Sequence, residues 1–197
     1  VNTFGKINVT INDVSGDGSA LVINNGTGGN RMSFVNDTNN ISYSVDSTNE
    51  EIDVKFTDSI SGQLLIGGGS SIAASNLTIE TQGDVSNGIV ISDNGLTSTT
   101  GNISITHSNA MARNITLTDD GNGAEPAIET GTGNITLSTT GAINESMNNA
   151  NSTLQTSGGN ITLVANGIGN TNSLDIELMA DSGTLSVTSK GTNNINI

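Results

Sequence analysis

A short phrase that recurs along the second half of the chain constrains the fold more than any other feature. The phrase is Asn, an aliphatic residue, Ser or Thr, and a second aliphatic residue, and Gly or Ser precedes most copies. The clear copies are Asn76–Ile79, Asn102–Ile105, Asn114–Leu117, Asn134–Leu137 and Asn160–Leu163, with looser ones from Thr184 and Asn194. Repetition at a period of about 20–50 residues indicates an architecture in which each repeat packs only on its neighbours.

The spacing of the phrase predicts one coil of a solenoid per repeat. Cutting before each main copy gives segments 76–101, 102–133, 134–159 and 160–183, followed by a partial segment 184–197. The usual length is about 24–26 residues, and 102–133 is longer because the Asn114 copy forms a second strand in it. Short runs within each segment alternate apolar with polar residues, and Gly, Asn, Ser and Asp join them. Two or three such strands per repeat are typical of a parallel β-helix.

This pattern also predicts which side chains face inward. The alternating Ile and Leu residues point into the coil, whereas the Ser and Thr residues between them face solvent. The solvent-facing residues Thr78, Ser104, Thr136, Thr162 and Ser186 form one mixed column, which suggests water ordering only as a minor possibility. The asparagines that open the phrase are expected to stack as a structural ladder, and these are Asn76, Asn102, Asn134 and Asn160. Pro126 removes a backbone donor and is expected at a corner.

Residues 1–75 are less regular than residues 76–197, and we treat the two as separate regions. Strand-like pieces are Lys6–Ile11, Ala20–Asn24, Arg31–Val35, Ile41–Val45, Ile52–Phe56 and Gln63–Ile66. Their spacing fits either the first coils of the same helix or an antiparallel cap or sandwich. A capping role is reasonable because the end of a solenoid must be covered.

Composition and charge exclude several classes of function. Asn, Ser, Thr and Gly make up more than half of the 197 residues, and there are no cysteines and only 2% aromatic residues. The core is therefore expected to be thin and aliphatic, as in a solenoid. A net charge of −14 excludes a conventional nucleic-acid interface and disfavours an anionic membrane surface. No apolar run is long enough for membrane insertion as a helix.

No catalytic residue is predicted, and the metal candidates are weak. His107 is the only histidine, and we expect it at the surface in a turn, because no second His or Cys accompanies it. The pair Glu50–Glu51 lacks the aromatic platforms that carbohydrate-active sites usually have. Calcium is the one conceivable ion, and its candidate ligands in acidic Gly turns are Asp17, Asp119 and Asp120. Solvated turns are the simpler interpretation of these acidic residues, since no known calcium-loop spacing is present.

The phrase resembles the repeat region of large bacterial exoproteins of the filamentous haemagglutinin type, which include two-partner-secreted adhesins and autotransporter passengers. The resemblance is carried by Gly101–Ile105, Gly133–Leu137 and Gly159–Leu163 and covers residues 76–197. It implies export, a right-handed β-helix, and attachment to cells, surfaces or other bacteria. The predicted fold is accordingly all-β, a right-handed parallel β-helix (β-solenoid).

The expected function is a non-catalytic structural stalk or adhesin at the outer surface of a bacterium. Its expected partners are surface glycans or proteins, reached through the loops 119–127 and 144–152. The main alternative is a self-assembling subunit of a surface layer, sheath or fibre, in which neighbouring copies are the partners. A carbohydrate-active β-helix enzyme is the second alternative.

Overall fold

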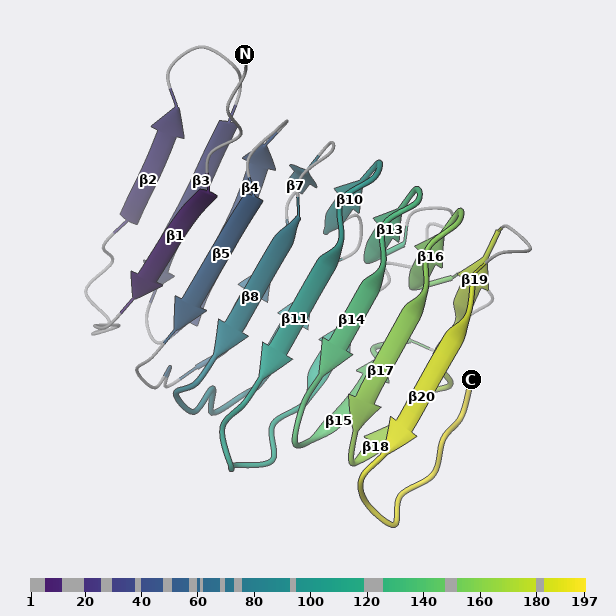
Figure 1. Ribbon diagram of the computed structural model, residues 1–197. Coiled ribbons are helices and arrows are strands. Elements are labelled where there is room, and N and C mark those ends of the chain that lie inside the picture. The colour runs from purple at the N-terminus through teal and green to yellow at the C-terminus, as the bar shows by residue number, and fades with distance from the viewer. Residues whose placement is uncertain are drawn as a thin grey trace.

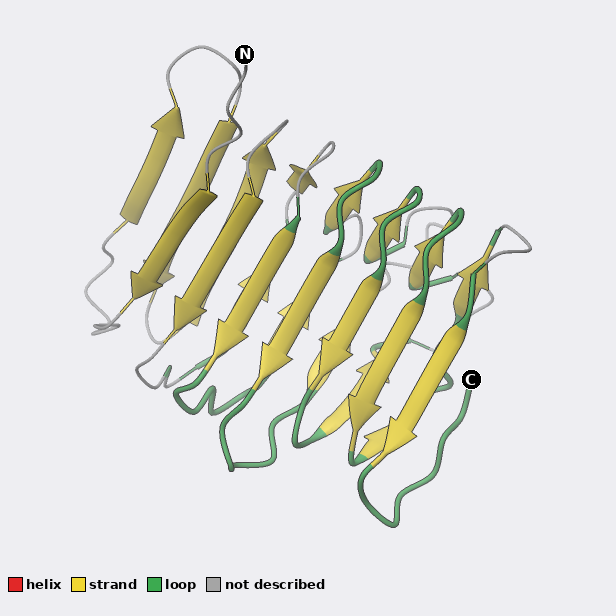
Figure 2. Ribbon diagram, viewed as in Figure 1, coloured by secondary structure: helices red, strands yellow, loops and turns green. Residues whose placement is uncertain are grey.

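The chain folds into stacked turns of β-structure without a helix among the described residues, as the computed structural model shows (Figures 1 and 2). The structure describes residues 6–11, 20–25, 30–37, 40–47, 51–56, 60, 62–67, 70–72, 76–92, 95–118, 126–147, 152–179 and 183–197. Within these residues no helix is long and apolar enough to cross a membrane.

One side of the stack is a parallel sheet of seven strands, which we call the front sheet. Its strands lie in the order β1, β5, β8, β11, β14, β17 and β20, so each strand pairs with the equivalent strand of the next turn. The bounds are Lys6–Ile11 for β1, Glu51–Phe56 for β5, Leu77–Thr81 for β8, Ile103–His107 for β11, Ile135–Ser138 for β14, Ile161–Ala165 for β17 and Leu185–Ser189 for β20.

The other two sides of each turn belong to a second sheet. One side, the second face, contains β6 (Leu64–Ile66), β9 (Ile89–Ile91), β12 (Ile115–Leu117), β15 (Ala142–Glu145) and β18 (Gly167–Ile168). The third face contains β7 (Ser70–Ile72), β10 (Leu96–Ser98), β13 (Ile128–Thr130), β16 (Leu154–Thr156) and β19 (Ile176–Leu178). Strands within each of these two faces are parallel. Three short strands therefore make one turn, and the turns wind in the right-handed sense (Figure 1). The predicted fold class is confirmed.

The register of the front sheet follows the repeated phrase. Ile103 pairs with Leu77 on one side and with Ile135 on the other, and Ile161 pairs with Leu185. The asparagines that precede these strands are separated by 26, 32 and 26 positions along the chain. The separation from Asn160 to Thr184 is 24. The turn of 32 residues accommodates its extra length without shifting the register, because Ile115 pairs in turn with Ile89 and Ile143.

A narrow aliphatic core fills the interior of the stack. The inward residues of β8, β11, β14 and β17 are 0–2% exposed, whereas the residues between them are partly exposed. Each Ile or Leu packs on its counterpart in the next turn, and complete burial of such a side chain is worth about 1.5–3 kcal/mol. Phe56 is the one aromatic residue in this core among the described side chains. Pro126 is buried directly before β13, where the chain enters the third face.

The N-terminal region combines parallel and antiparallel pairing. β1 extends the front sheet by pairing in parallel with β5. β2 (Ala20–Asn25), β3 (Asn30–Asp37) and β4 (Asn40–Ser47) form an antiparallel series instead. β4 is the junction, because it pairs in parallel with both β6 and β7 and so joins the second and third faces into one sheet. The parallel stack itself extends N-terminally of residue 76, since β5 pairs in register with β8.

Candidate functional site

The four ladder asparagines lie at one corner of the stack, where each turn enters the front sheet. The Asn76 Oδ1 atom accepts hydrogen bonds from the backbone N and the Nδ2 of Asn102, at 2.9 and 3.0 Å. The Oδ1 atoms of Asn102 and Asn134 each accept a backbone N–H from the asparagine of the next turn, at 2.8 Å. Asn160 continues the series to Thr184 at 2.9 Å. These side chains fasten successive turns to one another, as expected from the sequence.

A column of glycines lies immediately before the ladder. A Cβ atom on Gly133 would collide with the carbonyl oxygen of Gly101, and a Cβ atom on Gly159 would collide with that of Gly133. The turns therefore approach too closely at this corner for any side chain. The glycine that precedes the phrase is required by this close contact between turns.

Buried hydroxyl groups support the same corner from inside, and the sequence analysis missed them. Ser98, Thr130 and Thr156 lie in register on the third face and are 2%, 0% and 1% exposed. The Thr130 Oγ1 donates to the Gly133 carbonyl at 2.6 Å, and the Gly159 N–H donates to Thr156 Oγ1 at 2.9 Å. One sequence signal could have revealed these buried hydroxyls: a Ser or Thr stands three positions before each glycine that directly precedes the asparagine of the repeated phrase. A Ser or Thr side chain at such a position can hydrogen-bond to the backbone of the turn that follows it.

The outer surface of the front sheet carries a second outward column beside the expected one, and this second column is mixed, with one charged and one aliphatic residue among Ser and Thr. The first is the expected column from Thr78 to Ser186. The second column consists of Glu80, Thr106, Ser138, Val164 and Thr188. From β11 to β20 both columns are uncharged. The charge in this surface lies toward the N-terminal end, where Glu80 Oε2 pairs with Lys55 Nζ at 3.4 Å.

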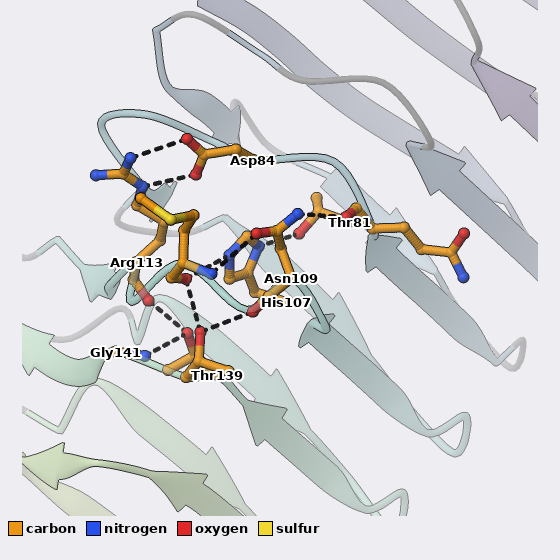
Figure 3. A network of polar contacts seen from close by, with 10 residues as sticks. Thr81, Asp84, His107, Asn109, Arg113, Thr139 and Gly141 are labelled. Carbon is orange, nitrogen blue, oxygen red and sulfur yellow. Dashed lines mark hydrogen bonds and ion pairs between the residues drawn. The ribbon is translucent and has the colours of Figure 1, made fainter.

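His107 is buried, so the expectation of a surface histidine was wrong. It ends β11 and is only 2% exposed. The alternation that directs Ile103 and Ile105 inward continues for one more step and directs the imidazole inward too. Thr81 lies beneath it in the preceding turn, with its Oγ1 2.7 Å from His107 Nδ1 (Figure 3).

The contacts of the imidazole define its protonation state. His107 Nε2 lies 3.3 Å from the Met111 carbonyl oxygen, which can only accept, so Nε2 carries the hydrogen. Nδ1 then accepts from the Thr81 hydroxyl. Burial lowers the pKa of His107, and this effect exceeds the opposing ones of the Met111 carbonyl and the Asp84 carboxylate. Both nitrogens of the neutral imidazole are thus engaged by neighbouring groups, and no three metal-ligating side chains converge on it among the described residues.

An ion pair links two turns at this same corner, between the front sheet and the second face (Figure 3). Arg113 donates from Nε and Nη2 to the two carboxylate oxygens of Asp84, at 2.7 and 2.8 Å. Hydrogen bonding by Arg113 holds the pKa of Asp84 below its usual value, and Asp84 raises the pKa of Arg113 in return. Thr139 donates to the Arg113 carbonyl and so ties in the following turn.

A buried carboxylate, Glu145, was also missed from the sequence. It is 1% exposed, and it occupies the inward position that Leu117 takes in the preceding turn. Its Oε2 accepts from Thr153 Oγ1 at 3.3 Å and from the Asp175 backbone N at 3.1 Å. These bonds join the second and third faces across adjacent turns. Glu145 therefore closes a corner in which an aliphatic residue would leave the Asp175 backbone N–H without this acceptor.

The calcium candidates stay untested. Asp17, Asp119 and Asp120 lie outside the described residues, as does Glu50, and the side chain of Glu51 is likewise not described. Among the residues that the structure describes, no three His, Asp or Glu side chains converge as metal ligands.

Comparison with known proteins leaves the chain without a family. No protein-family model, curated protein or solved structure matches it. The function must therefore be argued from the geometry of the stack alone.

Proposed function

We propose that this chain is a non-catalytic stalk segment of a secreted bacterial surface protein, with turns that contact cells, glycans or other proteins. The observation that carries the proposal is the uninterrupted in-register pairing of the front sheet from β1 to β20. Pairing of every turn with the next satisfies backbone groups along the whole length, and a rod of this kind keeps its shape under load.

The ladder corner supports this proposal because the side chains of its asparagines bind the next turn of the stack and not an outside partner. The side-chain oxygens of Asn76, Asn102, Asn134 and Asn160 are committed to the next turn. The polar groups left for partners are those of the outer columns and of the corner loops. Uncharged hydroxyls and amides suit weak contacts that become strong when many copies act together.

Two measurements test the stalk proposal together. Size exclusion with light scattering, first with calcium and then with chelator, should show a monomer in both conditions. A solid-phase assay should then show that the immobilised chain retains bacterial or host cells above a blank surface. Failure to retain any cell type would overturn the adhesive part of the proposal.

A self-assembling subunit of a surface layer, sheath or fibre is the second candidate, and one observation favours it. The outward residues of the front sheet carry no charge from β11 to β20. This face would therefore not repel a neighbouring copy. Ordered polymers in the light-scattering experiment would favour this candidate over the stalk.

A further inference from the structure

The corner between the front sheet and the second face changes length along the stack. The connection is residues 108–114 between β11 and β12, residues 139–141 between β14 and β15, and Asn166 alone between β17 and β18. It lengthens again to residues 190–194, after which Ile195 pairs with Ile168. In Figure 1 the two long connections project beyond the two tight ones between them. Two short corners between two long ones leave a notch.

The notch is a groove of about 350 Å³, and amide side chains dominate its lining. Its polar side chains are Asn114, Asn144, Asn166, Asn170, Thr171 and Asn193. No charged or aromatic side chain of the described residues contributes to the lining. Arg113 lies beside the groove in sequence, but its guanidinium group is paired with Asp84.

Contacts between turns hold several of these amides in place. Asn114 Oδ1 accepts from the Ala142 backbone N at 2.9 Å, and Asn144 Oδ1 accepts from the Asn170 backbone N at 3.1 Å. Asn166 donates its Nδ2 to the Thr140 carbonyl. Each bond uses one end of the amide. The Nδ2 of Asn114, the Nδ2 of Asn144 and the Oδ1 of Asn166 have no hydrogen-bond partner among the described residues.

We propose that this notch is a binding site for the neutral end of a saccharide. Amides present a donor and an acceptor side by side, and a sugar hydroxyl needs both. Fixed amides lose little conformational entropy when they bind a ligand. Among the described residues the lining offers no cation for a uronate, sialate or sulfate, and the chain carries a net charge of −14. The volume is near the lower end of small-ligand sites, about 300–1,000 Å³, which limits the bound part to a short terminus.

The described lining residues include no aromatic side chain on which a sugar ring could stack, and this lowers the affinity that we expect for a single saccharide. Stacking on aromatic rings is a major source of contact area in small-ligand sites. A site made of amides alone should therefore bind a single saccharide weakly, in the millimolar range. This inference rests on the proposed function, because weak sites gain strength when many copies are displayed on one surface.

Saturation-transfer NMR of the purified chain tests the site directly. The probes are free glucose, galactose, mannose and N-acetylglucosamine and their disaccharides, each measured beside an acidic counterpart. We expect saturation of at least one neutral sugar and weaker saturation of the acidic ones. Saturation of no neutral sugar, or stronger saturation of the acidic sugars, would overturn the inference.

Variants place the binding in the notch. Asn170→Ala combined with Asn193→Ala removes two side chains that have no side-chain hydrogen bond with the described residues, so the fold should persist. Titration should show binding about tenfold weaker, as expected from the loss of one or two hydrogen bonds. The matched control is Asn194→Ala, an exposed neighbour outside the lining, which should bind as the wild type does. Asn114→Asp keeps the acceptor for the Ala142 backbone N and removes only the Nδ2 donor, so it should also weaken binding. Unchanged binding by both the double variant and Asn114→Asp, with unchanged circular dichroism spectra, would exclude the notch as the site.

The cell-retention assay separates this inference from the stalk proposal. If the wild type and the double variant retain cells equally well, the adhesive function stands and the notch is not its site. If the wild type binds sugar in the notch but retains no cells, the notch stands and the adhesive function fails.

Discussion

Two corners of the same turn behave in opposite ways along the stack. At the ladder corner, where the chain enters the front sheet, three consecutive turns repeat Gly-Asn at residues 101–102, 133–134 and 159–160, and the same hydrogen bond joins successive turns from Asn76 to Asn160. At the opposite end of the front sheet, the variable corner ranges from residues 108–114 to Asn166 alone. One corner is constrained by contact between turns at every level, whereas the other is free to lengthen outward. The repeated corner holds the fold, and the variable corner gives each turn its own surface.

The largest expected effect comes from breaking the ladder corner with a single methyl group. Gly133→Ala places a Cβ against the carbonyl oxygen of Gly101, a backbone atom that cannot rotate away. We expect a loss of about 3 kcal/mol in the free energy of unfolding, at the upper end of overpacking effects, as measured by urea denaturation. Gly158→Ala is the matched control, because its Cβ would meet nothing closer than 3.7 Å. Equal stability of the two variants would show that the turns are not in close contact here.

The next largest effect is a pH dependence of the free energy of unfolding, which arises from the buried His107 at the variable corner. Burial lowers the pKa of His107 below its ordinary value of 6.5, so protons bind the unfolded chain more readily than the folded one. The contribution of the neutral His107 to the free energy of unfolding is therefore complete above about pH 6.5, and it is lost as the pH falls toward the pKa of His107 in the folded state. The slope contributed by one histidine is at most about 1.4 kcal/mol per pH unit.

The double variant Thr81→Val/His107→Leu isolates this pH term. It removes both hydrogen-bonding partners together and leaves an apolar contact. Urea denaturation between pH 7.5 and 5 should show a steeper loss of stability in the wild type than in this variant. Parallel pH curves for the two proteins would contradict the assignment of a neutral buried histidine.

A smaller effect is expected from the ladder itself. Asn134→Ala removes the acceptor for the Asn160 backbone N–H, which lies 2.8 Å from Asn134 Oδ1. The expected loss is about 1 kcal/mol, since one hydrogen bond is lost and the site is exposed to water. Asn134→Asp is the control, because it keeps an acceptor oxygen at the same place. Thermal unfolding should place the Asp variant above the Ala variant, and the reverse order would show that the oxygen contributes nothing.

The smallest effect is expected from the ion pair at the variable corner. Asp84 and Arg113 are partly exposed, with 23% and 27% of their side-chain surfaces accessible, so solvent screens their attraction. A double-mutant cycle with Asp84→Asn and Arg113→Gln should give a small favourable coupling that fades at high salt. A coupling that is independent of salt would indicate that the pair acts through packing instead of charge.

Much of the front sheet and its ladder could be predicted because both follow from local patterns. The alternation in Ile103–Ile105 and its copies specifies which residues face inward, and the recurring asparagine specifies where the turns meet. His107 and Glu145 were missed because a polar residue at the end of an alternating run looks like the start of a turn. Their burial depends on partners in other turns, such as Thr81 for His107 and Thr153 for Glu145.

The N-terminal region shows the same limit in another form. Its strands are visible in the sequence, but β1 pairs in parallel while β2, β3 and β4 pair in antiparallel fashion. The sequence of a single strand does not show whether it pairs in parallel or in antiparallel fashion, because side chains alternate with a period of two in both kinds of strand. The pairing was therefore open until the register was known.

The sequence by itself determined that the chain would coil, with a period near 24–26 residues and a thin aliphatic interior, because period and alternation are properties of consecutive residues. Only the tertiary structure decided which corner connections project farther from the stack than those of the neighbouring turns. It also decided which polar side chains lie close together between these connections. The notch lined by Asn114 and Asn166 belongs to this second class. Its walls come from turns far apart in sequence, and their relative height depends on how each turn stacks on the one before it.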